Sequence, residues 1–459
     1  MALIFIDRES EIKLLEQLHK KEAASLVLLY GRRRIGKTRL IQEFMKHAEG
    51  IYFYTPNSEE KTILTELSRA VEDEFFKGFR FTDFTAFLSY IERKCQEGAV
   101  IAIDEFQRLS NIDGAISLIQ RRWDEKLSTG KGLIILSGSS IGATHRLALR
   151  GDAPLHGRRT ATIKLEPLKY LDLEKWFRNY PAEELVRIYG SFGGTPAYLE
   201  YIDHEVGVDA NIVANILAKN SPLHDEPETL LMGELRSPQR YMDILSTLAQ
   251  GRNTITDIAN STGINRENVS TYLSTLGTLD LVERITPVTA PRAKKGLYAI
   301  RDPFFRFWFR FVRPNKRQLE LGLENNVWES AKEEFNQHLG YIFEDICVAV
   351  ITAMGKKGML PLRIDRIGRW WMKDAEIDIL VLEKRGGALA VEAKWSEVSY
   401  REGKRLLSAL SKKATQVPDI EEPTLGVIAK KLEEKEKLRE EGFWVLDLDD
   451  FKDRELNQP

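Results

Sequence analysis

The first half of the chain alternates short apolar runs with segments of helical spacing. Residues 25–31 (SLVLLYG) form a continuous apolar run that ends at a glycine, which is typical of a buried parallel strand followed by a turn. Comparable runs follow at 51–55, 99–105 and 132–140 (IYFYT, AVIAIDE and GLIILSGSS), with helical spacing between them. This alternation predicts an α/β fold with a parallel, doubly wound sheet.

From about residue 165 the pattern becomes mostly helical, and a second group of elements follows. Its helical segments lie at 241–250, 254–263 and 265–282, and its strand-like pieces at 282–288 and 296–300. This order, helices followed by a two-stranded wing, is typical of a winged helix-turn-helix. The aromatic run 303–312 (PFFRFWFRFV) predicts a helix that packs in the core rather than a base-stacking platform.

The last part of the chain predicts a second α/β domain. A helix is expected at 333–354, a strand pair at 375–383 and 387–395, a basic helix at 400–414 and further strands at 424–430 and 443–448. The short turn between the paired strands indicates a hairpin.

Composition narrows the class of protein. A chain of 459 residues with 43% hydrophobic and 30% charged residues fits several soluble globular domains. No apolar run approaches the ~20 residues that span a membrane. Because the first residues include no basic n-region and no small-residue cleavage site, we do not expect a secretory signal there. The two cysteines, Cys95 and Cys347, favour a reduced, cytoplasmic setting. Because 67 basic residues oppose 69 acidic ones, any contact with DNA must come from local basic patches.

The segment GRRRIGKT at 31–38 matches G-x-x-x-x-G-K-[ST] and lies between a predicted strand and a predicted helix. In such a loop the backbone N–H groups surround phosphate, Lys37 reaches the β- and γ-phosphates, and the Thr38 hydroxyl binds Mg²⁺. We therefore expect ATP and Mg²⁺ as cofactors. The residues expected at the nucleotide are Gly31, Arg32, Arg33, Arg34, Ile35, Gly36, Lys37, Thr38, Arg39, Asp104 and Ser137.

Two acidic residues end the apolar run 99–105. Beside a phosphate-binding loop, Asp104 is expected to hold Mg²⁺ through water, and Glu105 to activate the attacking water. This pair favours hydrolysis over nucleotide binding alone. Ser137 and Ser139 end a later strand, where one of them can sense the γ-phosphate; a small polar residue that closes a strand is the alternative.

Arg158 and Arg159 are candidates for an arginine finger, acting within the chain or from a neighbouring subunit of a homo-oligomer. Ordinary surface arginines remain the alternative. Arg32, Arg33 and Arg34 lie inside the loop, where only the backbone need face phosphate, so their side chains can also contact a partner.

These motifs together resemble the archaeal AAA-like ATPases related to the STAND and origin-recognition ATPases. The resemblance rests on FIDRESEIKLL, GRRRIGKT, IAIDEFQRL, ILSGSS, PLHGRRT and FGGTPAYL. It implies that Phe5 to Arg8 pack against adenine and that the FGGTPAYL segment, in a helical lid, contacts nucleotide.

The helix at 265–276 would be the recognition helix of the winged helix-turn-helix. Its early polar residues can reach base edges or phosphates, and the wing can reach the DNA backbone. The helix residues are Asn265, Arg266, Asn268 and Ser270, and the wing cations are Arg292, Lys294 and Lys295. Packing between domains is the alternative, because winged helices also serve as packing modules. The helix carries Glu267 and only one arginine.

The C-terminal hairpin carries a second candidate site. Glu392 and Lys394 point to one face of a strand, and the hairpin brings Asp378 alongside them. Two carboxylates can bind Mg²⁺, a lysine can position the attacking water, and Glu344 can add a ligand. This D…E-x-K arrangement resembles the PD-(D/E)xK nucleases, most of all the archaeal resolvase and restriction-type branch. The basic helix adds Arg405, Lys412 and Lys413 for phosphate contacts, with a solvated face as the alternative.

The sequence thus predicts an ATPase that acts on DNA, with metal-dependent cleavage of DNA as its output and Asp378, Glu392 and Lys394 as the nuclease residues. The predicted domains are a P-loop core at 1–164, a helical lid at 165–233, a winged helix-turn-helix at 234–315 and a nuclease-like domain at 327–459. The alternative is a regulatory switch of the STAND kind, in which ATP controls partner binding and the C-terminal domain is an inert interaction module. Neither hypothesis includes a membrane.

Overall fold

The computed structural model describes residues 5–293 and 295–452, which form two compact units. Of the described residues, the first unit comprises 5–167 together with 195–197, and the second comprises 168–194, 198–293 and 295–452.

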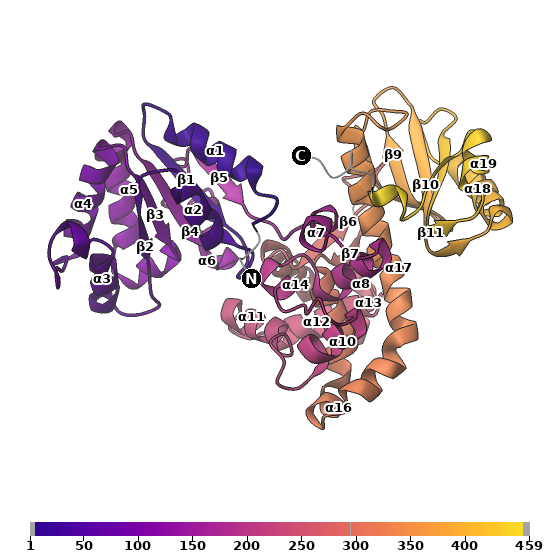
Figure 1. The fold of residues 1–459 in the computed structure, drawn as a ribbon, viewed down its shortest axis with the longest axis horizontal. Coiled ribbons are helices and arrows are strands. Elements are labelled where there is room, and N and C mark those ends of the chain that lie inside the picture. The colour runs from indigo at the N-terminus through magenta and orange to yellow at the C-terminus, as the bar shows by residue number, and fades with distance from the viewer. Residues whose placement is uncertain (1–4, 294, 453–459) are drawn as a thin grey trace. The chain divides into compact units, whose positions relative to one another are not determined.

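The first unit is a five-stranded parallel sheet with helices on both faces (Figure 1). The strands are β1 (Ser25–Tyr30), β2 (Gly50–Tyr54), β3 (Val100–Asp104), β4 (Leu133–Gly138) and β5 (Ala161–Lys164), in the order β2-β3-β4-β1-β5. The helices are α1 (Glu9–His19), α2 (Lys37–Met45), α3 (Glu60–Arg69), α4 (Phe84–Gln96), α5 (Ala115–Glu125) and α6 (Ile141–Thr144).

Side chains of β1 alternate between two hydrophobic cores. Val27 and Leu29 pack with α1 and α2, whereas Leu26 and Leu28 pack with α3, α4 and α5. A strand that is buried on both faces needs an uninterrupted apolar run, which explains SLVLLY. The α/β fold with a parallel sheet is therefore confirmed, and the carboxyl ends of β1, β3 and β4 lie at one edge of the sheet.

The second unit begins with helices and a small antiparallel ribbon. Its helices are α7 (Tyr170–Trp176), α8 (Ala182–Phe192), α9 (Pro196–Leu199, which begins in the first unit), α10 (Val208–Ile212), α11 (Glu226–Glu234), α12 (Gln239–Ala249), α13 (Ile255–Thr262) and α14 (Arg266–Thr278). The ribbon joins β6 (Val282–Ile285) to β7 (Leu297–Ile300). A capping box of Thr254 and Asp257 starts α13, and Gly263 ends it with a φ of +68°.

The aromatic run forms α15 (Pro303–Phe307) and the following π-helical turn (Trp308–Val312). All of its aromatic rings are buried, and α15 packs against α8. The expected core-packing helix is therefore confirmed.

The C-terminal part is a five-stranded mixed sheet. Its strands are β8 (Arg366–Met372), β9 (Ala375–Leu382), β10 (Ala388–Val398), β11 (Thr424–Leu432) and β12 (Trp444–Leu446), in the order β12-β11-β10-β9-β8. Its helices are α16 (Lys316–Glu320), α17 (Glu324–Lys356), α18 (Tyr400–Ala414) and α19 (Lys435–Glu440). β9 and β10 are antiparallel, as the predicted hairpin requires, whereas β10, β11 and β12 are parallel.

One described helix, α17, is long and apolar enough to cross a membrane by length and composition alone. Half of its most apolar window is buried inside the molecule, and α17 contacts α8 and β10. This is the environment of a core helix.

Candidate functional site

The loop between β1 and α2 depends on two glycines. A Cβ atom at Gly31 would lie 2.4 Å from Ile35 Cδ1 and 2.4 Å from the carbonyl oxygen of Leu165. Gly36 has a φ of +93°, which is a left-handed conformation that favours glycine. These requirements fold the segment into a tight loop directly before α2.

Gly36 is the N-cap of α2, and no described side chain caps this helix end. An uncapped helix N-terminus directs backbone N–H groups and a partial positive charge at a bound anion. Lys37 is buried in the loop, where its Nζ donates to the carbonyl oxygens of Gly31 at 2.9 Å and Arg32 at 2.7 Å. The residues present therefore fit a phosphate group.

Thr38 and Asp104 connect the loop to the acidic end of β3. Thr38 Oγ1 donates to Asp104 Oδ2 at 2.7 Å, and Asp104 is buried whereas Thr38 is exposed. A hydroxyl and a carboxylate in contact supply oxygen atoms of the kind that Mg²⁺ prefers. The predicted Mg²⁺ residues are therefore adjacent, and the donor set fits the ion.

Tyr52 on β2 is a residue of this site that the sequence did not predict. Its hydroxyl donates to Asp104 Oδ2 at 2.7 Å. Burial, followed by the hydrogen bond to Asp104, raises the pKa of Tyr52, so the phenol stays protonated and remains a donor.

Glu105 is held by polar neighbours at the end of β3. Its φ of +57° is unusual for a residue with a side chain, and its N–H donates to Asp104 Oδ1 at 3.0 Å. Glu105 Oε2 accepts from Ser139 Oγ at 2.7 Å and from Gln107 Nε2 at 2.5 Å. A carboxylate fixed in this way is suited to orient a water molecule.

Arg108 joins Glu105 to the end of β2. Its guanidinium lies 3.7 Å from Glu105 Oε2 and donates to the Tyr54 hydroxyl at 2.8 Å and the Thr55 carbonyl at 3.0 Å. Both acidic residues of the site thus contact β2 groups, Asp104 directly and Glu105 through Arg108.

The other predicted nucleotide residues have different surroundings. Ile35 is buried, Arg33 and Arg34 are exposed, and Arg39 lies 3.9 Å from Glu43 on the same helix. Ser137 Oγ is buried and has no hydrogen-bond partner among the described residues. Of the two serines, Ser139 is the one that contacts Glu105.

The two candidate arginine fingers bind protein groups in this structure. Arg158 makes a two-pronged ion pair with Asp124, with Nε–Oδ1 and Nη2–Oδ2 distances of 2.8 Å, and this hydrogen bonding lowers the pKa of Asp124. Arg159 donates to Thr162 Oγ1 at 2.7 Å. Because Nε, Nη1 and Nη2 of Arg158 all donate to protein groups, Arg158 would have to leave these partners to reach a phosphate.

Of the two segments named by the family resemblance, residues 5–8 lie in the first unit, whereas only residues 195–197 of the FGGTPAYL segment do. Phe5 packs against the core of α1 and α2, and buried Arg8 donates to the Glu166 carbonyl at 2.6 Å. In the FGGTPAYL segment, Thr195 is buried and the Ala197 N–H donates to the carbonyl oxygen of Arg34 at 3.5 Å. This segment therefore contacts the phosphate-binding loop.

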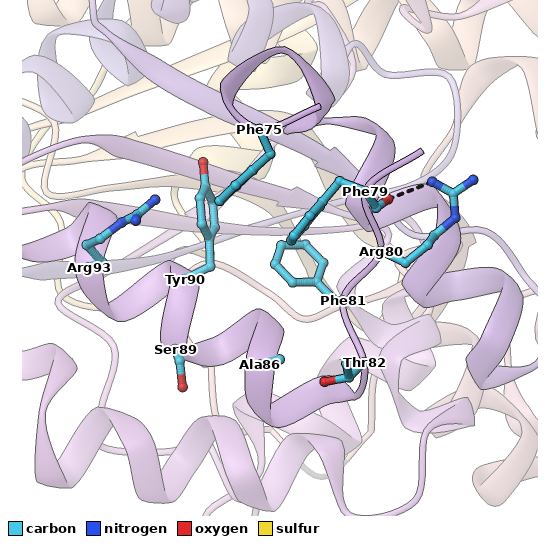
Figure 2. Close-up of a pocket in the computed structure, with 9 residues that line it drawn as sticks. All are labelled: Phe75, Phe79, Arg80, Phe81, Thr82, Ala86, Ser89, Tyr90 and Arg93. Carbon is cyan, nitrogen blue, oxygen red and sulfur yellow. Dashed lines mark hydrogen bonds between the residues drawn. The ribbon is translucent and has the colours of Figure 1, made fainter. Parts of the chain in front are cut away.

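A separate hollow of about 370 Å³ lies beside α4 (Figure 2). Four of its nine lining residues are aromatic, and the Phe75 and Phe79 rings stack with centroids 4.3 Å apart. Arg80 lies 3.0 Å from Glu72, and the Tyr90 hydroxyl donates to Glu74 at 2.9 Å. With its cations paired to carboxylates, this hollow lacks the features of a phosphate site.

The C-terminal hairpin brings together the predicted acidic residues and lysine. Lys394 Nζ lies 2.9 Å from Glu392 Oε1 and 3.6 Å from Asp378 Oδ2. Lys413 on α18 lies 3.1 Å from Glu392 Oε2, a partner that the sequence did not predict. Burial and the neighbouring Glu392 raise the pKa of Asp378.

Glu344 on α17 pairs with Arg369 on β8. Burial raises the pKa of Glu344 to about 7, although Arg369 opposes this shift. Within residues 5–293 and 295–452, no group of three or more His, Cys, Asp or Glu side chains is arranged to hold a metal ion. The carboxylates offer oxygen donors, but lysine and arginine side chains contact them in this structure.

The predicted recognition helix is α14, and its early polar residues are on the surface. Asn265, Arg266, Asn268 and Ser270 are exposed, while Val269 is buried. In the wing, Arg292 and Lys295 are exposed, and Lys294 lies outside the described residues. The exposed face is polar and carries few charges.

Comparison with protein families identifies three regions. Residues 5–202 match an ATPase domain predominantly from Archaea, and residues 238–284 match bacterial regulatory proteins of the arsR family. Residues 308–406 match archaeal and bacterial proteins of unknown function. The predicted archaeal ATPase domain is confirmed, and the arsR match covers α12, α13, α14 and the beginning of β6.

Similar proteins are found in archaea. The uncharacterized protein MJECL04 of Methanocaldococcus jannaschii is 33% identical over 463 residues, covering 98% of this chain and all of that protein. The uncharacterized ATP-binding protein MJ0423 of the same organism is 42% identical over 45 residues, covering 10% of this chain and 76% of that protein. The Walker-type ATPase PABY2304 of Pyrococcus abyssi has a similar structure, with a TM-score of 0.50, 21% identity, and coverage of 66% of this chain and 96% of that one.

Proposed function

This chain belongs to the same family as MJECL04 of Methanocaldococcus jannaschii, and on that premise we propose that its ATPase domain binds ATP at residues 31–38 and hydrolyses it with Asp104 and Glu105. The observation that carries this proposal is the 2.7 Å hydrogen bond from Thr38 to Asp104. It joins the first turn of the helix after the phosphate-binding loop to the acidic end of β3, so phosphate-binding and metal-binding groups meet at one place.

Each residue contributes a separate part of the chemistry. The N-terminus of α2 and the Lys37 ammonium bind the phosphates, and Thr38 and Asp104 would hold Mg²⁺. When bound, Mg²⁺ neutralises charge that develops on the phosphate oxygens. Glu105, held by Ser139 and Gln107, orients the attacking water and accepts its proton.

Substitution of Lys37 tests the proposal. In Lys37→Ala the loop loses its buried ammonium, so we expect ATP affinity to fall at least about tenfold and hydrolysis to become undetectable. Lys46→Ala is the matched control, because Lys46 follows the same helix but is exposed and pairs with Glu43. Calorimetric titration and phosphate release give the two readouts, and unchanged values in Lys37→Ala would refute ATP binding at this loop.

We further propose that the ATPase acts on DNA through α14. The exposed polar residues of α14 and the match to arsR-family regulators support this proposal. Binding would rest on few phosphate contacts because the face carries few charges, so we expect a shallow salt dependence. Fluorescence anisotropy with duplex DNA at several salt concentrations tests this, with Asn268→Ala against Asn325→Ala on α17 as the control.

A second candidate function is cleavage of DNA by the C-terminal domain. The convergence of Asp378, Glu392 and Lys394 on the hairpin supports it. The test compares plasmid and branched-DNA cleavage with Mg²⁺ or Mn²⁺ by wild type, Glu392→Ala and Glu397→Ala, where Glu397 is exposed on the same strand. Metal-dependent cutting that only Glu392→Ala loses would support a nuclease. No cutting by the wild type, with hydrolysis of ATP intact, would favour the regulatory switch.

A further inference from the structure

Asp104 has hydrogen-bond donors on both carboxylate oxygens. Oδ2 accepts from Thr38 Oγ1 and from the Tyr52 hydroxyl, both at 2.7 Å, and Oδ1 accepts from the Glu105 N–H at 3.0 Å. A carboxylate oxygen has two lone pairs, so the two hydroxyl groups use those of Oδ2. The side chain of Asp104 is thus fixed in one orientation.

The sheet order places Tyr52 within reach of Asp104. β2 is the edge strand beside β3, and their register pairs Tyr52 with Ala102 and Tyr54 with Asp104. Tyr52 is therefore two residues from the position opposite Asp104, and its hydroxyl spans that separation. Because the ring of Tyr52 packs against the core of α1 and α2, the hydroxyl is held in place by a rigid side chain.

We propose that Tyr52 is a positioning residue that keeps the Asp104 carboxylate oriented for the metal ion of bound Mg²⁺–ATP. This inference rests on the proposed function. A Thr38 oxygen that bound the metal ion would use a lone pair, so its hydroxyl could still donate to Asp104 Oδ2. The Tyr52 hydroxyl and the Glu105 N–H are two further donors to this carboxylate, and removal of the Tyr52 hydroxyl would leave Asp104 less firmly oriented.

A purely structural role of Tyr52 makes a different prediction. If only the packing of the ring mattered, phenylalanine would replace tyrosine without effect, because the two rings have nearly the same shape. If the hydroxyl orients Asp104, Tyr52→Phe weakens metal binding while metal-free nucleotide still binds normally. Residues that orient metal ligands typically contribute about 10–100-fold to metal affinity or activity.

The experiment measures Mn²⁺ binding to the protein–ADP complex by electron paramagnetic resonance, and ADP affinity in EDTA by calorimetry. In Tyr52→Phe we expect Mn²⁺ affinity to fall about tenfold, with ADP affinity in EDTA and the thermal midpoint close to wild type. Tyr90→Phe is the matched control, since its hydroxyl also donates to a carboxylate, Glu74, but lines the separate hollow of Figure 2. We expect it to bind Mn²⁺ like the wild type.

A double-mutant cycle identifies the route of the effect. If Tyr52 acts through Asp104, adding Tyr52→Phe to Asp104→Asn changes Mn²⁺ affinity much less than it does in the wild type. Equal losses in both backgrounds would overturn the inference, as would wild-type Mn²⁺ affinity in Tyr52→Phe. If the wild type neither hydrolyses ATP nor binds Mn²⁺ with ADP, the proposed function itself fails, and the two failures are therefore distinguishable.

Discussion

At the scale of single residues, Glu105 is the group whose chemistry can be separated from its structural role. Glutamine at this position keeps an oxygen that can accept hydrogen bonds from Ser139 and Gln107, but it cannot accept a proton. We therefore expect Glu105→Gln to bind ATP within about threefold of wild type, while its rate of hydrolysis falls about 100-fold or more. Single-turnover hydrolysis and ATP titration measure the two quantities.

The control for this substitution is Glu97→Gln, which changes an exposed carboxylate after α4. It should leave both quantities unchanged. If Glu105→Gln hydrolysed ATP at the wild-type rate, Glu105 would not be the base, and another group would have to activate the water.

His338 predicts a pH dependence of stability. Burial among the rings of Phe307, Phe311 and Phe335 lowers the pKa of His338 from 6.5 to about 3. Its Nε2 lies 3.0 Å from the Gly190 carbonyl oxygen, which can only accept, so this nitrogen carries the proton of the neutral ring. Below pH 6.5 the unfolded chain binds a proton that the folded protein does not, so stability is lost as the pH falls.

The size of this effect follows from the same shift. The free energy of unfolding is expected to be about 2 kcal/mol lower at pH 5 than at pH 7.5. Urea denaturation at pH 5 and pH 7.5 measures the unfolding free energies of wild type and His338→Gln. We expect the difference between these two proteins to be smaller at pH 5 than at pH 7.5 by about 2 kcal/mol. His204→Gln alters an exposed histidine in the same unit and should show no such narrowing. Parallel pH curves for wild type and His338→Gln would contradict the prediction.

The residues of the proposed ATP site differ in how far the sequence predicts them. Lys37, Thr38, Asp104 and Glu105 belong to motifs whose spacing along the chain already indicates phosphate and metal chemistry. Tyr52 and Arg108 have no such motif. Their contacts depend on β2 lying next to β3, and strand order is a property of the tertiary fold. In the same way, the pairing of Lys413 with Glu392 depends on how α18 packs against β10.

At the scale of elements, the turn between α8 and α9 contains a close approach of two backbone segments, at Gly194 and Leu168. A Cβ atom at Gly194 would lie 1.8 Å from the Leu168 carbonyl oxygen, and the Leu168 N–H donates to the Gly194 carbonyl at 2.8 Å. Because backbone lies against backbone, neither side can yield easily. We expect Gly194→Ala to lower the unfolding free energy by about 3 kcal/mol, at the upper end of the usual cost of overpacking, as measured by urea denaturation.

Gly340→Ala is the control, and we expect it to raise the unfolding free energy rather than lower it. Gly340 lies inside α17, and a Cβ atom there would meet nothing within 4 Å. Alanine at such a helical position stabilises by about 0.5–1 kcal/mol, because glycine loses more backbone entropy on folding. If both substitutions had the same sign, the close approach at Gly194 would not be the cause of its effect.

The sequence predicted the strands that are buried on both faces of a sheet, but it did not predict two edge strands. The apolar runs of β1, β3 and β4, buried on both faces, indicated strands in the sequence. β5 and β8 lie at sheet edges and keep polar or partly exposed residues, as in ATIK and RIGRWWM. Edge strands carry charge to discourage pairing with other chains, and this weakens the pattern that predicts them. α17 also starts nine residues before the helix predicted at 333–354, at Glu324.

At the scale of the whole molecule, the question is whether the proposed ATP site and the proposed DNA-binding face of α14 influence each other. The chain supplies a covalent route, because residues 195–197 belong to the first unit while the residues on either side belong to the second. Within this segment, the Ala197 N–H contacts the carbonyl of Arg34 in the phosphate-binding loop. A change in the loop on nucleotide binding would therefore act on a segment that continues into the second unit.

Thermodynamic linkage gives a test of coupling between nucleotide binding and DNA binding. If a non-hydrolysable ATP analogue changes DNA affinity by some factor, DNA must change the affinity for that analogue by the same factor. We expect a factor of about 5–150, the usual range of coupling between sites. The measurements are DNA anisotropy with and without the analogue, and analogue titration with and without DNA. Lys37→Ala should bind DNA like the nucleotide-free wild type and lose the response to the analogue. If the analogue left DNA affinity unchanged and DNA left analogue affinity unchanged, α14 and the proposed ATP site would act independently. DNA would then not be a partner whose binding ATP controls.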